Sequence, residues 1–148
     1  MSNEFPEPFV RLDTFSSSVW HRTRMGRYRI EGTECNTCGE KFFPPRTGLI
    51  CPSCNERDMK PYECAHTGTI VTLAPDDMGF PAIGYGDYLP RQQAIIRLDD
   101  GVHVMTDIME VENPDEIKLG DRVRMVLRKH KREDTGAWVY GFRFVLDT

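Results

Sequence analysis

Four of the five cysteines in this chain have the spacing of a metal site. Cys35 and Cys38 form one C-x2-C pair, Cys51 and Cys54 form a second, and twelve residues separate the pairs. Two intervening residues allow both thiolates of a pair to reach one tetrahedral ion, and the second pair completes the four ligands. This pattern predicts one Zn²⁺. A rubredoxin-like iron site is the alternative, because four tetrahedral thiolates suit either ion.

The same ligand set predicts a structural metal rather than a catalytic one. Catalytic zinc keeps one position for water or substrate, whereas four cysteines fill all four positions. A redox role for either C-x2-C pair is less expected, because the two pairs occur as a set. Asn36, Gly39 and Asn55 are placed to form the tight turns of the two metal-binding loops.

The fifth cysteine, Cys64, is the remaining candidate for chemistry. No serine, histidine and aspartate constellation and no family-type cysteine motif surrounds it. We interpret Cys64 as a buried structural residue, with a nucleophile as the alternative. His66 lies two residues further on, while His21, His103 and His130 are scattered without ligand spacing. The sequence therefore predicts no catalytic residue in this chain.

A second cluster of functional interest is the basic segment "RVRMVLRKHKRED", which includes Arg128, Lys129 and Lys131. Three interpretations remain open: a solvated barrel face, a site for a phosphate-bearing ligand, and a nucleic-acid site. Arginine and lysine bind phosphates by fork and by point charge, respectively. The net charge of −4 argues against nucleic acid. Aromatic residues of the last predicted strand would be available for base stacking.

The composition is that of an ordinary globular protein. The chain has 148 residues, of which 39% are hydrophobic and 28% charged, which fits one domain or two small modules sharing a core. No apolar run reaches the roughly 18–20 residues needed to span a bilayer. The N-terminal residues lack the apolar stretch of a signal peptide. We therefore expect a cytoplasmic protein, in whose compartment paired cysteines more often bind metals than form disulfides.

The elements that position the cysteines begin with a predicted helix. Ser16–Met25 has a capping serine and an apolar side, and Gly26 is expected to end the helix. Alternation at 28–30 predicts a short strand entering the first cysteine pair. Between the pairs, "FFPPR" predicts a rigid segment. Its rings, Phe42 and Phe43, either project toward a partner or pack inside the metal-binding module.

From about residue 60 the pattern is that of β-strands. A strand is predicted near Gly68–Leu73, and the aromatic, glycine-rich stretch 79–90 is predicted to be a functional loop. Asp99-Asp100-Gly101 between two apolar runs predicts a hairpin. Two further strands flank 134–136. In the last of them five residues share one face: Trp138, Tyr140, Phe142, Phe144 and Leu146.

These elements predict a mainly β fold with three parts. An N-terminal extension with a helical segment covers residues 1–27, and a rubredoxin-like zinc ribbon covers 28–60. The third part, residues 61–148, has five predicted strands with a connector between the third and fourth, which suits an OB-type barrel.

Several motifs together carry a resemblance to a known family over nearly the whole chain. They are "YRIEGTECNTCGEKFFPPR", "CPSCN", "AIIRLDDG", "VRMVLRKHKRE" and "YGFRFVLD". The sequence resembles the zinc-ribbon plus OB-fold family of small thiolase-partner proteins, known as a domain of unknown function. Members of this family include the small subunits of benzoylsuccinyl-CoA thiolase and of the diacetylphloroglucinol acetyltransferase. Archaeal relatives bridge a thiolase and a hydroxymethylglutaryl-CoA synthase.

This resemblance implies a non-catalytic accessory subunit of a thiolase or acyltransferase complex that acts on acyl-CoA. The nucleophile is then expected on the partner chain, and an aromatic acyl-CoA thiolase of anaerobic toluene breakdown is the favoured type. The family's link to CoA implies that Arg128, Lys129 and Lys131 contact CoA phosphates. Two alternatives remain: a single-strand nucleic-acid-binding OB module with a structural zinc, and a stand-alone enzyme that uses Cys64.

Overall fold

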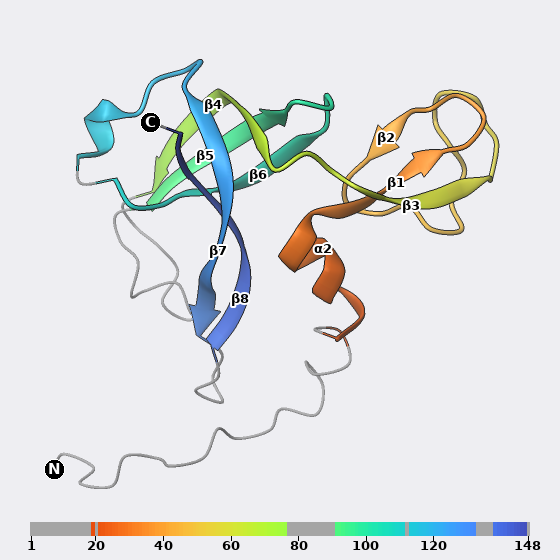
Figure 1. Cartoon of the computed structure of the whole chain (residues 1–148), viewed down its shortest axis with the longest axis horizontal. Coiled ribbons are helices and arrows are strands. Elements are labelled where there is room, and N and C mark those ends of the chain that lie inside the picture. Colours follow the sequence, from red (N-terminus) through yellow and green to blue (C-terminus); the bar gives the residue numbers. More distant parts are fainter. Residues whose placement is uncertain (1–18, 20, 77–90, 112, 133–137, 148) are drawn as a thin grey trace, which may run out of the picture.

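The computed structural model describes residues 19, 21–76, 91–111, 113–132 and 138–147, and it shows two β units joined by a single linker. A small three-stranded sheet lies at one end of the molecule and a closed barrel at the other (Figure 1). A short helix, α2, lies beside the linker between them. Within the described residues, no helix has both the length and the apolar character needed to cross a membrane.

Helix α2, Arg24–Arg29, runs through Gly26, so the predicted helix end at Gly26 was wrong. Of the earlier part of the predicted helix, Val19 is helical, and 16–18 lie outside the described residues. A glycine inside a helix costs only about 1 kcal/mol relative to alanine, which packing readily offsets. Here a Cβ built on Gly26 would lie 3.8 Å from the ring of Phe43, so the residue packs closely against its surroundings.

The helix ends instead at Ile30, which adopts the left-handed conformation with φ 51° and ψ 44°. This conformation is unfavourable for a β-branched residue. Ile30 is completely buried, and this burial compensates for the backbone conformation. The predicted strand at 28–30 was therefore wrong, because α2 extends to Arg29 and the first strand begins one residue after Ile30.

The small sheet has the strand order β2-β1-β3. Its strands are β1, Glu31–Cys35; β2, Lys41–Phe42; and β3, Met59–Glu63. A Cβ built on Gly32 of β1 would lie 2.1 Å from the carbonyl oxygen of Phe42. Only glycine therefore allows β1 and β2 to approach this closely.

The barrel contains five strands in the order β4-β5-β6-β8-β7 and closes through pairing of β4 with β7. The strands are β4, Thr67–Asp76; β5, Arg91–Leu98; β6, His103–Ile108; β7, Arg122–Arg132; and β8, Trp138–Leu146. A 3-10 turn, η3 (Pro114–Glu116), lies in the connector before β7. The parallel pairing of β6 with β8 at Ile108 and Phe144 completes the OB-type topology, which confirms the predicted fold class.

The predicted hairpin at Asp99-Asp100-Gly101 is confirmed between β5 and β6. Gly101 has φ 90°, and its N–H donates to the carbonyl oxygen of Leu98 at 2.9 Å. This positive φ explains the need for glycine in the turn. The predicted loop 79–90 and the turn at 134–136 lie outside the described residues.

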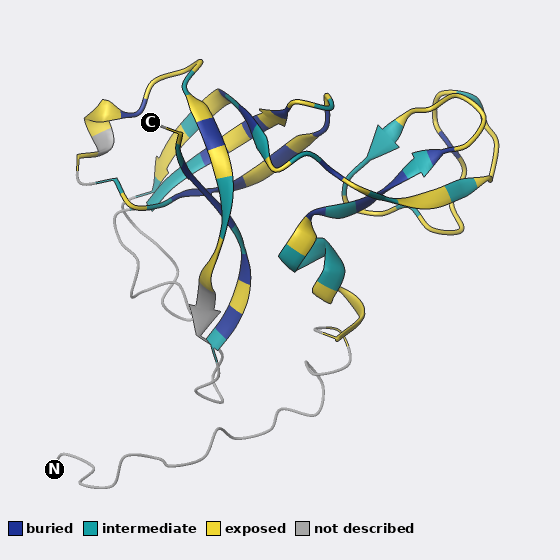
Figure 2. Ribbon diagram, viewed as in Figure 1, coloured by how far each residue is buried: buried dark blue, intermediate teal, exposed yellow. Residues whose placement is uncertain are grey.

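The barrel interior forms the main hydrophobic core, and its buried positions alternate along the strands (Figure 2). The largest wholly buried side chains are Phe144, Ile70, Ile96, Leu98, Val104 and Val123. Phe142 and Leu146 pack against them, whereas Tyr140, on the same predicted face, is 41% exposed. Ile30 and Cys64 belong to the same cluster, so the core extends to the linker between the two units.

Candidate metal centre

The four predicted ligands converge at the tip of the small sheet. The Sγ atoms of Cys35, Cys38, Cys51 and Cys54 all lie within 4.8 Å of one another. The Sγ atoms of Cys35 and Cys54 are 3.5 Å apart, and those of Cys38 and Cys51 are 3.6 Å apart. Tetrahedral zinc with Zn–S bonds of about 2.3 Å requires sulfur atoms about 3.8 Å apart. The cluster therefore has the dimensions of a tetrahedral metal site.

The two cysteine loops repeat the same backbone hydrogen bonds. In the first loop the Cys35 N–H donates to the Glu40 carbonyl at 2.8 Å, and the Gly39 N–H donates to the Cys35 carbonyl at 2.9 Å. In the second loop the corresponding pairs are Cys51 to Glu56 and Asn55 to Cys51, each at 2.8 Å. Each pair of ligands is thus held by an equivalent turn.

Gly39 and Asn55 occupy the left-handed positions of these turns, with φ values of 73° and 61°. Glycine and asparagine are the residues that tolerate this conformation best, which confirms their predicted role. Asn36 acts differently. Its side-chain amide donates to the Asp58 carboxylate at 2.8 Å, and its N–H donates to the Asp58 carbonyl at 2.9 Å. Asn36 therefore connects the first loop to the residues that lead into β3.

The protein environment lowers the pKa of two of the four thiols, Cys35 and Cys51, and raises that of the other two, Cys38 and Cys54. The backbone N–H of Cys38 is the largest influence on Cys35 and lowers its pKa to about 7. The backbone N–H of Glu56 lowers the pKa of Cys54, but burial and the neighbouring sulfur atoms outweigh it and raise that pKa to about 12. Four thiolates crowded together need a cation to compensate their charge, and thiol ligands lose their protons on binding a metal.

No second group of three or more histidine, cysteine or acidic side chains with ligand geometry occurs in the described part of the chain. Within the centre, Cys35 and Cys51 are buried, Cys54 is half-buried and Cys38 is exposed. The four sulfur atoms fill the four positions of a tetrahedron. The arrangement can therefore hold one metal ion firmly and leaves no position for a substrate.

Cys64 lies away from the metal centre and is only 2% exposed, which confirms its predicted burial. Burial, and secondly the carboxylate of Asp100, raise the pKa of its thiol to about 11. His66, two residues further on, contacts other groups: its imidazole lies 3.2 Å from the carbonyl oxygen of Arg29 and 3.2 Å from the carboxylate of Glu63. A buried, protonated thiol is a poor nucleophile.

Two of the three predicted CoA-contacting residues, Arg128 and Lys129, have described side chains, and each contacts another side chain. Nε and Nη2 of Arg128 donate to the same carboxylate oxygen of Glu110 at 2.7 and 2.5 Å. The ammonium group of Lys129 lies 4.7 Å from the ring centroid of Trp138. Lys131 follows a register shift in β7, and its side chain lies outside the described residues.

An ionic cluster formed by side chains from four barrel strands, β4, β5, β6 and β8, was not predicted from the sequence. Arg91 donates to both carboxylate oxygens of Asp107 at 2.8 and 3.1 Å, and Arg143 lies 3.2 Å from the same carboxylate. Asp76 lies 3.6 Å from Arg91. Asp107 and Arg143 are buried residues. The signal in the sequence was a charge between aromatic residues in the last strand, where Arg143 separates Phe142 from Phe144.

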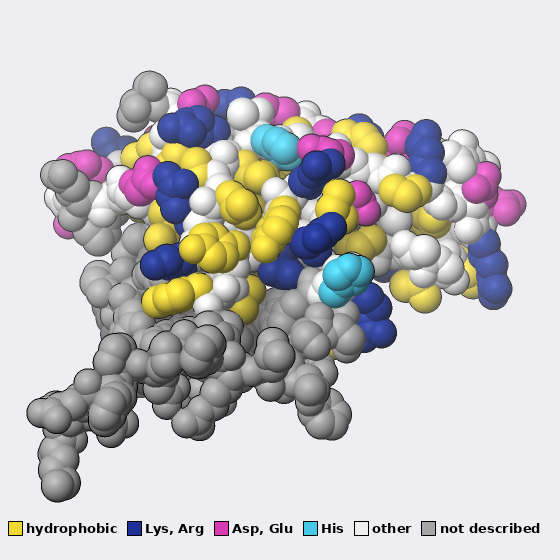
Figure 3. Space-filling model, turned by 60° about the horizontal axis from the view of Figure 1, so that its bottom comes forward, with side chains coloured by type: hydrophobic (Ala, Val, Ile, Leu, Met, Phe, Trp, Pro, Cys, Tyr) yellow, Lys and Arg dark blue, Asp and Glu magenta, His cyan; other side chains and the backbone are white. Residues whose placement is uncertain are grey.

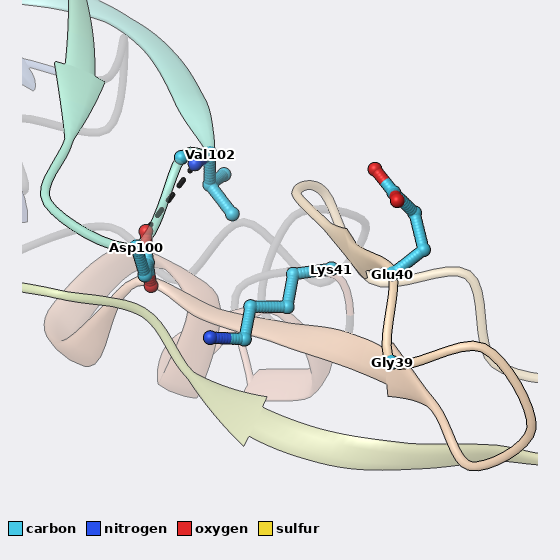
Figure 4. A pocket seen from close by; sticks show the side chains of 6 residues that line it. Gly39, Glu40, Lys41, Asp100 and Val102 are labelled. Carbon is cyan, nitrogen blue, oxygen red and sulfur yellow. Dashed lines mark hydrogen bonds between the residues drawn. The ribbon is translucent and has the colours of Figure 1, made fainter.

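A polar pocket of about 220 Å³ lies where the small sheet meets the barrel. Lys41 of β2 extends across it toward the turn that carries Asp100 (Figure 4). The Lys41 ammonium lies 4.4 Å from the ring centroid of Tyr62, and hydrogen bonding to Tyr62 is the main influence that raises the pKa of Lys41. Asp100 accepts hydrogen bonds from the backbone N–H groups of Ala65 at 2.8 Å and Val102 at 3.3 Å. Through these hydrogen bonds Asp100, a residue of the pocket lining, connects the linker at Ala65 to the barrel.

Positive, negative and hydrophobic side chains are interspersed on the face of the molecule shown in Figure 3. Hydrophobic side chains gather near its middle, with lysine and arginine side chains among them. A mixture of this kind differs from the continuous basic surface that non-specific nucleic-acid binding requires.

Comparison with known proteins agrees with this architecture. Residues 62–128 match the family model described as the ChsH2 C-terminal OB-fold domain. A solved structure described as the Ltp2-ChsH2(DUF35) aldolase superposes with a TM-score of 0.64 at 21% identity, covering 95% of this chain and 99% of that chain, and so shares the fold.

Two DUF35 domain-containing scaffold proteins have higher sequence identity to this chain. The protein from Methanothermobacter thermautotrophicus is 35% identical over 119 residues, which is 80% of this chain and 86% of that protein. The protein from Pyrococcus furiosus is 33% identical over 129 residues, which is 86% of this chain and 90% of that protein. With this identity over most of both lengths, the chain belongs to the family of DUF35 domain-containing scaffold proteins.

Proposed function

We propose that this protein is a non-catalytic, zinc-binding accessory subunit of a thiolase or acyltransferase complex that acts on acyl-CoA. The observation that carries the proposal is the closed set of four thiols at Cys35, Cys38, Cys51 and Cys54. A metal with four protein ligands holds a fold together and does not activate a substrate. Zinc is favoured over iron because the site needs no redox activity for this role.

The described residues also support placing the nucleophile on another chain. Cys64 is buried with a raised pKa, whereas a nucleophilic cysteine needs a lowered pKa or a neighbouring general base. The two relatives are described as scaffold proteins, and the solved structure is described as an aldolase of Ltp2 with ChsH2(DUF35). These descriptions support an accessory role for this chain beside a catalytic partner.

We further propose that the chain divides into three parts, the N-terminal extension at residues 1–27, the zinc ribbon at 28–60 and the barrel at 61–148. Two elements extend across these boundaries, because α2 reaches Arg29 and β3 reaches Glu63. The ribbon and the barrel would therefore act as one connected surface. They are joined at the linker, where the Cys64 N–H donates a hydrogen bond to the Ile30 carbonyl.

CoA binding by the basic strand is the finer part of the proposal. Lys129 is exposed on β7, and its ammonium, which lies over the Trp138 ring, could also contact a phosphate. Arg128 would have to exchange its contact with Glu110 for the ligand. Lys131 belongs to the proposal by its charge and its place in the strand. An aromatic acyl group, as in benzoylsuccinyl-CoA thiolase, is supported by the sequence resemblance alone.

A second candidate function, single-strand nucleic-acid binding, is favoured by one observation. A cation and an aromatic ring lie together at Lys129 and Trp138, and this combination suits a stacked base and its phosphate. The net charge of −4 opposes it. The two functions differ in salt response, since nucleic-acid affinity falls steeply with added salt.

Affinity purification of the full-length chain from its native host distinguishes these functions. The proposed function predicts stoichiometric recovery of a larger thiolase-like or acyltransferase-like chain, resistant to nuclease treatment. Recovery of RNA or DNA without such a chain would support the second candidate and contradict the first. Addition of CoA to the recovered complex would then test its binding, with Lys129→Glu expected to weaken it and Lys118→Glu, at an exposed position outside the basic strand, as the matched control.

A further inference from the structure

Three neighbouring barrel strands present an apolar outer face. Val71 of β4, Ile95 of β5 and Met105 of β6 are exposed, with Met105 70% exposed. Ile95 is directly paired with Met105 on one side and with Thr72 on the other. Ala74 lies two residues beyond Thr72 on the same side of β4. We call these five residues the β4–β6 face.

This face contains a shallow hollow of about 80 Å³ between strands β4, β5 and β6. Its lining includes Thr72, Ala74, Ile95 and Met105. The volume suits a single aliphatic side chain. Methionine at its rim can adjust its unbranched side chain to the shape of an incoming group.

Charges at the two ends of the face are arranged differently. At one end Arg97 is paired across the strands with His103, and both residues are exposed. Within the described residues Arg97 makes no ion pair. At the other end the carboxylate of Asp107 is already engaged by Arg91 and Arg143. The face therefore offers an uncompensated positive charge at one end, which is complementary to a carboxylate.

The same face distinguishes a protein ligand from a nucleic acid. Strands β5 and β6 are the second and third of the barrel, the position at which OB folds bind oligonucleotides. Bases bind there by stacking on aromatic rings. The β4–β6 face consists of aliphatic, threonine and methionine side chains, with no aromatic ring among its five residues. Its chemistry therefore matches the apolar centre and charged rim of a protein interface.

We propose that the β4–β6 face is the docking surface for the catalytic subunit of the complex. That subunit inserts an aliphatic side chain into the hollow beside Met105 and places a carboxylate against Arg97. This inference rests on the proposed function and specifies which surface of this chain the partner covers.

The test uses the full-length, tagged chain to recover the catalytic subunit identified with the wild-type protein. Met105→Glu places a charge in the apolar centre, and Arg97→Glu reverses the charge at the rim. Each substitution is expected to reduce retention of the partner about tenfold or more, as for central interface residues. Arg97→Lys keeps the positive charge and should retain most binding. Leu49→Glu, at a residue that is 53% exposed on the ribbon, is the matched control and should retain the partner.

Thermal unfolding of each variant separates loss of binding from loss of folding, and Arg97→Glu alone decides the matter if Met105→Glu does not fold. Unchanged retention of the partner by Arg97→Glu and by any folded Met105→Glu would overturn the inference and leave the proposed function intact. Equal loss in Leu49→Glu would also overturn it. Absence of a catalytic chain with the wild-type protein, or recovery of nucleic acid that Met105→Glu abolishes, would overturn both.

Discussion

The ring of Phe43 in the cysteine-containing segment meets the ring of Phe142 in barrel strand β8 edge to face, with centroids 5.7 Å apart and an interplanar angle of 76°. This contact joins residues 99 positions apart in sequence, and it connects the ribbon to the barrel core. Phe43 therefore neither projects freely toward a partner nor packs only within the metal-binding module.

We predict that Phe43→Ala and Phe142→Ala each lower the free energy of unfolding by about 1–3 kcal/mol, because each removes part of a packed aromatic pair. A double-mutant cycle measured by chemical denaturation should give a coupling energy of about 0.5–1.5 kcal/mol. Phe42 provides the control, since its ring lies near the Arg46 guanidinium instead. A Phe42–Phe142 coupling as large as that of Phe43–Phe142 would contradict this assignment.

The metal centre makes a prediction about composition. Purified protein should contain about one zinc ion per chain, and Cys35→Ser together with Cys51→Ser should abolish zinc binding and unfold the ribbon. Elemental analysis and circular dichroism provide the measurements. Cys64→Ala is the matched control, because Cys64 is also buried but lies outside the cluster, and this variant should retain its zinc. A wild-type protein without metal would exclude the assignment.

The buried ionic cluster makes a prediction about stability. Asp107→Ala leaves Arg91 and Arg143 without the carboxylate that they share, so it should lower the free energy of unfolding by about 3–5 kcal/mol. Asp147→Ala removes the partner of Arg124 in an exposed pair, and it should cost at most about 1 kcal/mol. Denaturant unfolding compares the two variants. Similar small losses would show that the cluster contributes little.

The pH dependence of stability should include a contribution from Asp99. The guanidinium of Arg122 donates to both carboxylate oxygens of Asp99 at 2.6 and 2.9 Å. This contact, and secondly the hydrogen bond from the Thr67 hydroxyl, holds the pKa of Asp99 well below its usual range. Its pKa is thus lower in the folded than in the unfolded state, so the stabilisation is fully present above the unfolded pKa of about 3.9 and is lost as pH falls below it.

Unfolding free energies of the wild type and of Asp99→Asn should therefore differ at neutral pH and converge as the pH decreases from about 4 toward 2. Asp115→Asn, at an exposed position in η3, controls for the general effect of removing a carboxylate. A difference that remains constant throughout acidification would show that the Asp99–Arg122 pair is not responsible.

The sequence predicted best those features that depend on a few neighbouring residues. The metal centre follows from two C-x2-C pairs, and the β5–β6 hairpin follows from Asp99-Asp100-Gly101 between apolar runs. Barrel closure was also accessible, because five short strands with one long connector favour the OB-type topology.

Features that depend on tertiary contacts were missed or placed wrongly. Gly26 has the local signature of a helix end, but its packing near Phe43 and the burial of Ile30 allow α2 to continue. Arg91, Asp107 and Arg143 come from three different strands, so their cluster appears only when the barrel closes. The same dependence on long-range pairing explains why the β4–β6 face had no signal in any single segment.

The division of roles between this chain and its partner can be measured by assaying acyl-CoA turnover with each chain alone and with both together. Turnover is followed as the change in free CoA thiol, which thiolysis consumes and acyl transfer from CoA releases. We predict no turnover by this chain alone and full turnover by the reconstituted complex, unchanged when Cys64→Ala replaces the wild-type chain. Turnover by this chain alone, abolished by Cys64→Ala, would contradict a non-catalytic role and identify Cys64 as a nucleophile.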